Sequence, residues 1–161
     1  MAMMPSATPS ASDTVDALLV TSRRLVAVAA RSIASVGDEV SVVQFRALVV
    51  MWERAPRTLA SLAAELDVHP STATRLCDRL VAKGLIDRQP SPDSRREVEL
   101  TLTDDGRELV RRAIDRRRRD LLTVARRLAP AERASVIAAF ELFDRAAGSI
   151  ADDDPTVPWP R

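Results

Sequence analysis

The sequence predicts a mostly α-helical protein with one small antiparallel β-hairpin. Apolar residues recur at helical spacing along most of the 161 residues. The period changes at Val98, Leu100 and Leu102, which alternate with polar residues as in a half-buried strand. The preceding segment "GLIDRQ" is the expected partner strand, and "PSPDSRR" is the loop between the two. The predicted order is therefore four helices, the hairpin and two further helices.

The first two helices have recognisable ends. Apolar side chains repeat over residues 13–37, and Gly37 is expected to close this long first helix. Ser41 suits the N-cap of the second helix, and Gln44 stands three residues later, as a capping box requires. Pro56 prevents the second helix from continuing.

Two shorter helices follow, joined by a tight turn. Thr58 is the expected N-cap of the third helix, "LASLAAEL". Pro70 suits the first position of the fourth helix, which is expected to end at Lys83 and Gly84. Residues 58–83 therefore have the plan of a helix-turn-helix.

The last two helices follow the hairpin. Thr103 is the expected N-cap of the fifth helix, and the two aspartates after it suit the positive end of the helix dipole. This helix is expected to run to about Leu128. Pro130 interrupts it, and a last helix is predicted over about residues 131–147.

The composition favours a soluble protein in the cytoplasm. The chain is 46% apolar and 29% charged, and its formal net charge of +1 does not by itself indicate a nucleic-acid partner. No stretch approaches the roughly 20 apolar residues that a membrane helix needs. The opening segment "MAMMPSATPSASD" lacks the basic and apolar regions of a secretory signal. We therefore expect no membrane contact.

Catalytic and metal sites are not expected. The single histidine, His69, and the single cysteine, Cys77, cannot supply the ligands of an ordinary zinc site. On one helix they are separated by about 12 Å of rise, too far for a nucleophile and its base. The four glycines are scattered, so they form no phosphate-binding loop. The sequence predicts no enzyme, no cofactor and no metal.

One face of the fourth helix carries small hydroxyl residues followed by arginines. Opposite the apolar side chains of this helix lie Ser71, Thr72, Thr74, Arg75, Asp78 and Arg79. In a helix-turn-helix, such a face meets base edges in the major groove of DNA. The alternative is the solvated face of an ordinary helix.

The predicted hairpin carries two arginines at its tip. Arginine suits insertion into a narrow and electronegative minor groove, which favours a DNA contact by Arg95 and Arg96. Asp93 stands two residues before Arg95, where its carboxylate suits a pair with the guanidinium. The alternative is an ion pair that serves only the protein surface.

These elements together resemble the core of the MarR family of winged-helix transcriptional regulators. The resemblance is carried by "LASLAAELDVHPSTATRLCDRLVAKGLIDRQPSPDSRREVELTLTDDGREL". Within it, "PSTATRLCDRLVAKGLI" is similar to the family's recognition helix and the turn into the wing, and "DSRR" to the D-x-R of the wing. "LTLTDDG" resembles the strand before the long fifth helix, and "SVVQFRAL" the second helix, so that the likeness covers residues 13–147.

Three positions depart from the family pattern. Asp67 stands where the family often has glycine in the turn. His69 replaces the serine or aspartate that often caps the recognition helix, and its cap is expected to be weaker. Cys77 replaces an aliphatic residue. None of the three removes a DNA contact.

The resemblance implies a homodimeric DNA-binding repressor. Residues 13–40 and 104–150 are expected to form the helical dimerisation region, and residues 41–103 the winged helix-turn-helix DNA-binding domain. Residues 1–12 are expected to be mobile, and residues 151–161 a disordered tail. The implied partners are double-stranded DNA with a pseudo-palindromic operator and a small aromatic or acidic effector that releases it. The alternative is a winged-helix module for protein interaction or dimerisation without DNA binding.

The candidate site residues follow from the helix face, the hairpin and the resemblance. The candidate DNA-binding residues are Pro70, Ser71, Thr72, Thr74, Arg75, Arg79, Arg88, Asp93, Arg95 and Arg96. Cys77 shares the apolar face of its helix and is expected in the core, with a redox role as the alternative.

Arg117 falls on the apolar stripe of the fifth helix, three residues after Ile114 and four before Leu121. We expect it to be the most buried of the four consecutive arginines and to pair with a carboxylate at the dimer interface or in a ligand crevice. The alternative is that its stem lies along the stripe and its head reaches water.

Overall fold

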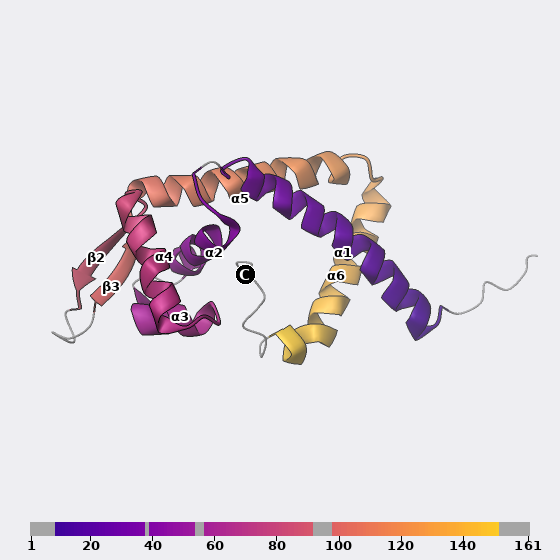
Figure 1. Ribbon diagram of the computed structural model, residues 1–161. Helices are drawn as coiled ribbons and strands as arrows, with labels where there is room; N and C mark the ends of the chain where they lie inside the picture. Colours follow the sequence, from indigo (N-terminus) through magenta and orange to yellow (C-terminus); the bar gives the residue numbers. More distant parts are fainter. Residues whose placement is uncertain (1–8, 38, 54–56, 92–97, 152–161) are drawn as a thin grey trace, which may run out of the picture.

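The computed structural model describes residues 9–37, 39–53, 57–91 and 98–151. Helices dominate these ranges and a small antiparallel sheet is the only other regular structure described there, which confirms the predicted fold class (Figure 1). The elements in chain order are α1 (Ala11–Ala34), α2 (Val42–Glu53), β1 (Arg57–Thr58), α3 (Leu59–Glu65), α4 (Pro70–Ala82), β2 (Ile86–Pro90), β3 (Val98–Leu102), α5 (Asp104–Ala125) and α6 (Pro130–Ala151).

The first helix begins two residues earlier than the sequence predicts. The Asp13 N–H donates to Ser10 Oγ, and the Ser10 N–H donates to the Asp13 carboxylate, so these two residues form a capping box. The pKa of Asp13 is lowered because the Ser10 N–H and the Ser10 hydroxyl both donate to its carboxylate. At the other end α1 stops at Ala34, and Gly37 lies beyond it in a turn. The start of α1 is therefore set by a capping box, which the apolar periodicity does not predict.

The core is built around α2. This helix is apolar on nearly all sides, and seven of its residues are buried: Gln44, Phe45, Ala47, Leu48, Val49, Val50 and Met51. A helix of this kind belongs in the centre of a domain. Its start is the predicted capping box, because the Ser41 N–H donates to Gln44 Oε1 (3.0 Å) and the Gln44 N–H to Ser41 Oγ (3.3 Å).

The sheet has three antiparallel strands in the order β1-β3-β2. The predicted hairpin is confirmed, with Ile86 opposite Leu102 and Pro90 opposite Val98. The short strand β1 was not predicted, because its two residues form a strand only through their pairing with β3. Thr58, which ends β1, also caps α3 as predicted, accepting from the Ser61 N–H at 3.2 Å.

The start of α5 is packed closely against the loop that follows α4. Thr103 caps α5 as predicted, and its hydroxyl also donates to the Gly84 carbonyl at 2.7 Å. Gly84 has a φ of +68°, the left-handed region that glycine adopts at helix ends. A Cβ atom at Gly106 would lie 2.0 Å from the Leu85 carbonyl oxygen, so this position of α5 requires glycine. These contacts fix α5 to the lobe formed by α2–α4 and the sheet.

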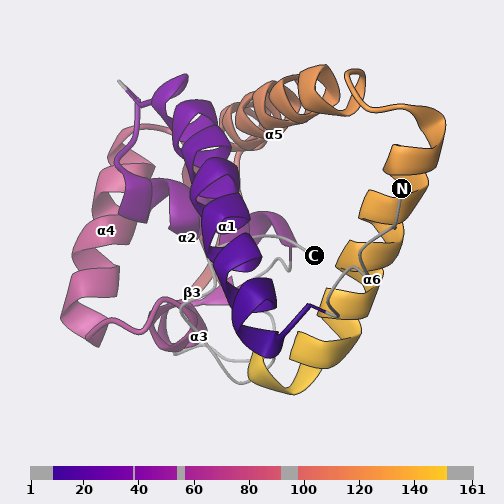
Figure 2. The same cartoon turned by 90° about the vertical axis from the view of Figure 1, so that its right-hand side faces the viewer.

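The last helix, α6, carries apolar side chains that are not buried in the core. The α6 helix turns back at the end of α5 and stands apart from α2–α4 (Figure 2). Every residue from 130 to 146 is exposed. The last helix is also longer than predicted, since it reaches Ala151. None of the helices in the described ranges is both long and apolar enough to cross a membrane.

Candidate nucleic-acid interface

The turn between α3 and α4 is made by an aspartate in an unusual conformation. Asp67 has a φ of 51°, in the left-handed region that glycine adopts easily and aspartate tolerates. The next residue, Val68, donates its N–H to the Ala63 carbonyl at 3.0 Å and so closes the turn. The non-glycine residue at this position therefore keeps the tight connection that a helix-turn-helix needs.

His69 caps the fourth helix. Its backbone is extended, with φ −60° and ψ 141°, and its Nδ1 accepts from the Ser71 N–H at 3.3 Å. This acceptor role requires the Nδ1 atom to be unprotonated. Pro70 occupies the first turn of α4 as predicted. The cap is thus present, although a ring nitrogen replaces the usual side-chain oxygen.

The two faces of α4 separate as the sequence predicts. Ala73, Cys77 and Leu80 are fully buried and anchor the helix to the core. The exposed side carries five of the candidate residues: Pro70, Ser71, Thr72, Arg75 and Arg79. Thr74 lies at the edge of this face, half-buried, and its hydroxyl donates to the Pro70 carbonyl at 2.9 Å. We call the five exposed residues the α4 face.

Arg88 reaches α4 from the neighbouring strand β2. Its Nη2 atom lies 2.7 Å from Asp78 Oδ1 and 3.5 Å from the Thr74 carbonyl oxygen. The two side chains of the ion pair remain 34% and 53% exposed. Arg88 therefore ties the hairpin to α4. The pair with Asp78 was not predicted, although opposite charges on either side of the Gly84 turn are a signal for it in the sequence.

Cys77 lies in the core, as expected. Burial raises the pKa of its thiol, and the nearby Arg88 guanidinium only partly opposes that effect. A buried thiol with a raised pKa is a poor nucleophile. The position thus matches the aliphatic residue that it replaces.

The loop end of the hairpin is held by a side-chain hydrogen bond. The hydroxyl of the buried Ser91 donates to Glu99 Oε1 at 2.7 Å, across the β2–β3 pair. Asp93, Arg95 and Arg96, the candidates at the tip, lie outside the described residues. Their contact with DNA stays a prediction.

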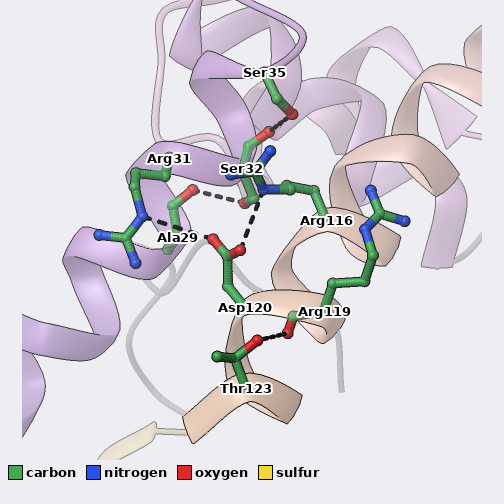
Figure 3. A network of polar contacts seen from close by, with 8 residues as sticks. All are labelled: Ala29, Arg31, Ser32, Ser35, Arg116, Arg119, Asp120 and Thr123. Atoms are coloured by element: carbon green, nitrogen blue, oxygen red, sulfur yellow. Dashed lines mark hydrogen bonds and ion pairs between the residues drawn. The ribbon is translucent and has the colours of Figure 1, made fainter.

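A second cluster of charges joins α1 to α5 (Figure 3). Asp120 lies 3.2 Å from Arg116 on its own helix and 3.6 Å from Arg31 on α1. Beside it the buried Ser32 hydroxyl donates to the Ala29 carbonyl at 2.7 Å. These contacts were not predicted from the sequence, because the two helices are far apart in the chain.

Arg117 is the most buried of the four consecutive arginines, as predicted. It is half-buried, whereas Arg116, Arg118 and Arg119 are exposed. Burial lowers its pKa, as expected for a cation partly removed from water. Its pairing with a carboxylate stays a prediction.

The described ranges bring no metal ligands together. Within them, no three side chains of His, Cys, Asp or Glu gather as a metal site would require. The exposed polar groups of the α4 face are the hydroxyls of Ser71 and Thr72 and the guanidinium groups of Arg75 and Arg79, which suit binding to a polyanion.

Comparisons with known proteins point to one family. The MarR family model matches residues 40–98. The uncharacterised HTH-type transcriptional regulator YhbI of Bacillus subtilis is 35% identical over 75 residues, which are 47% of this chain and 49% of that protein. The chain spans about half the length of the first curated relatives that it matches.

Solved structures extend the likeness to most of the chain. The crystal structure of RV1404 from Mycobacterium tuberculosis matches with a TM-score of 0.82 and 43% identity, over 89% of this chain and 98% of that one. A mutant of MepR from S. aureus, bound to an oligodeoxyribonucleotide, matches with a TM-score of 0.66 and 18% identity, over 83% and 96% of the two chains. The second likeness is one of fold alone, and it confirms the winged-helix architecture.

Proposed function

The chain belongs to the MarR family of transcriptional regulators, and from that premise we propose that it is a repressor that binds double-stranded DNA as a homodimer. The observation that carries the proposal is the α4 face. Hydroxyl groups and two arginines are exposed on a helix whose opposite side carries the fully buried Ala73, Cys77 and Leu80. A regulator of this kind catalyses no reaction, in agreement with the predicted absence of an active site.

In the proposed complex α4 enters the major groove. Ser71 and Thr72, at its N-terminal end, are short enough to approach base edges, whereas Arg75 and Arg79 reach bases or phosphates. Arg95 and Arg96 reach the adjacent minor groove. Arg88 is already engaged by Asp78, so it acts mainly by holding the hairpin against α4. The MepR mutant of similar fold, whose structure was solved with an oligodeoxyribonucleotide, supports DNA as the partner.

The exposed apolar surface supports the homodimer. Residues 13–40 and 104–150 form the proposed dimerisation region, and residues 41–103 the proposed DNA-binding domain. The large apolar side chains exposed in the dimerisation region include Val15, Leu18, Leu19, Leu122, Val124, Val136, Ile137, Phe140 and Phe143. Patches of this kind mark interaction sites in soluble proteins. A two-fold dimer covers them with the same surface of a second copy.

A small effector has a candidate site where α1 meets α2. A hollow of about 610 Å³ is lined there mainly by apolar residues: Val26, Ala29, Ala30, Ile33, Ala34, Gly37, Val40, Ser41 and Val42. Its volume lies in the range of ligand sites, roughly 300–1,000 Å³. It joins the proposed dimerisation region to the DNA-binding domain. An aromatic effector fits its lining. Arg117 on α5 does not line this hollow, and it stays a separate candidate partner for an acidic group. A repressor acts on the chromosome, so we place the protein in the cytoplasm.

Selection of bound sites from random duplexes tests the proposal. We expect an imperfect palindrome whose half-sites are about one helical turn apart, because two α4 helices are related by a two-fold axis. Arg79→Ala on the α4 face should weaken binding to the selected site, whereas Arg118→Ala, an exposed arginine of α5, should not. Recovery of no sequence, with no DNA retained, would favour the winged-helix module for protein contact instead.

A further inference from the structure

The segment between α1 and α2 is bonded both to α5 and to the end of the recognition helix. In the Glu39 carboxylate, both oxygens accept from Arg112 Nη2 of α5, at 2.9 Å and 3.0 Å. The backbone carbonyl of Glu39 accepts a hydrogen bond from Lys83 Nζ. One residue thus contacts two helices that belong to the two proposed functional regions of the chain.

Lys83 is well placed to transmit the position of this segment. It is the C-cap residue of α4 and the only lysine of the chain. Its ammonium group also donates to Gln44 Oε1 at 3.3 Å, and the same oxygen accepts the Ser41 N–H in the capping box of α2. The C-terminal end of α4 is therefore tied to the start of α2 and to Glu39.

We propose that Glu39 and Lys83 are positioning residues, which set the orientation of the recognition helix relative to α5 through the chain Arg112–Glu39–Lys83. This inference rests on the proposed function. In a dimer held by α5, a small rotation of α4 changes the spacing of the two recognition helices, and the spacing decides how well they fit successive major grooves.

The contacts add little to the stability of the fold. The Glu39 and Arg112 side chains are each 48% exposed, and exposed ion pairs contribute little in water. Loss of the Glu39–Arg112 pair is therefore expected to change the orientation of α4, and with it the DNA affinity, more than the free energy of unfolding. The corresponding loss of DNA affinity is about two- to fivefold per chain.

The sign of the charge change separates positioning from long-range electrostatics. Glu39→Gln removes a negative charge, so electrostatic attraction alone would raise the affinity for DNA. The positioning role predicts that the affinity falls. It also predicts that Arg112→Gln weakens binding and that the double variant is no weaker than the weaker single variant, because both changes break the same contact.

Arg111→Gln is the matched control for Arg112→Gln. It removes the same charge from the next position of α5, and it breaks ion pairs with Glu108 and Asp115, which lie on α5 itself. Its effect on DNA affinity measures the lost charge without any loss of contact between elements. Arg112→Gln should weaken binding more than this control does.

The experiment measures duplex affinity over a range of salt concentrations for these variants, together with amide hydrogen exchange of the protein without DNA. We expect Glu39→Gln to keep the slope of log K against log salt, since no phosphate contact is lost. The Lys83 and Gly84 amides donate to the Arg79 and Val81 carbonyls at the end of α4. In Glu39→Gln these two amides should exchange about two- to fivefold faster than in the wild type. Arg111→Gln should leave both amides unchanged.

Two outcomes overturn the inference. If the wild type binds DNA with the expected salt dependence while Glu39→Gln binds as tightly or more tightly, the positioning role is wrong and the proposed function stands. If the wild type binds no DNA, the proposed function fails. The exchange rates alone then test whether Glu39 holds the end of α4. Rates at Lys83 and Gly84 that are the same in Glu39→Gln and in the wild type would rule this out.

Discussion

Replacement of Gly106 by alanine should destabilise the junction between α5 and the DNA-binding lobe. The new methyl group would lie 2.0 Å from the Leu85 carbonyl oxygen and 3.0 Å from the Leu85 carbonyl carbon. Both atoms belong to the backbone, so α5 or the segment after α4 must move. Leu85 cannot move freely, because its carbonyl also accepts the Thr103 N–H at 3.2 Å.

The magnitude follows from two opposing effects. Overpacking typically costs about 1–3 kcal/mol, and the 2.0 Å approach to a backbone atom puts this case in the upper part of that range, at about 2–3 kcal/mol. The higher helix propensity of alanine returns at most about 1 kcal/mol. We therefore expect a net loss of about 1–2 kcal/mol in the free energy of unfolding. For a chain of this length that lowers the Tm by about 2–8 °C.

Thermal unfolding at a fixed protein concentration measures the effect, since a dimer's Tm depends on concentration. Gly148→Ala is the matched control, because nothing lies within 4 Å of a Cβ atom at that helical position. The control should unfold at the wild-type Tm or slightly above it. A Gly106→Ala protein with an unchanged or higher Tm would refute the close packing of α5 on Leu85.

Three further predictions concern the thiol, the dimer and the wing. Cys77 should resist an alkylating reagent at neutral pH in the folded protein and react on unfolding, because burial raises its pKa; rapid labelling of the native protein would contradict the core position. Ile137→Glu should give a folded monomer by sedimentation, since this side chain is 59% exposed on α6 in the single chain; an intact dimer would place the interface elsewhere. Arg95→Ala should weaken binding to the selected DNA site by about 1–3 kcal/mol without changing the Tm, and equal affinities would exclude a wing contact.

The local features of the fold could be predicted because their causes are local. Three helix starts are marked by a side chain that accepts from a nearby N–H, at Ser41, Thr58 and Thr103. A fourth is marked by the fixed φ of Pro70. The apolar period likewise placed Ala73, Cys77 and Leu80 in the core. It also predicted that Arg117 is the most buried of the four consecutive arginines.

The contacts between distant segments could not be predicted in the same way. Strand β1 exists only through its partner β3, and its two residues carry no period of their own. The pairs Asp78–Arg88, Asp120–Arg31 and Glu39–Arg112 join elements that are brought together by the packing of the core. Surface charges of this kind have many possible partners in the sequence, and only the fold selects one.

The salt dependence of duplex binding tests the central claim most directly. If each chain of a dimer presents the α4 face and a basic wing to DNA, about 6–10 phosphate contacts should give a slope of log K against log salt of about −5 to −9. The measurement needs only the wild-type protein, a selected duplex and a series of salt concentrations. A steep linear slope in this range is the predicted result. Binding that does not change with salt, or no binding at low salt, would contradict a DNA-binding function for this chain.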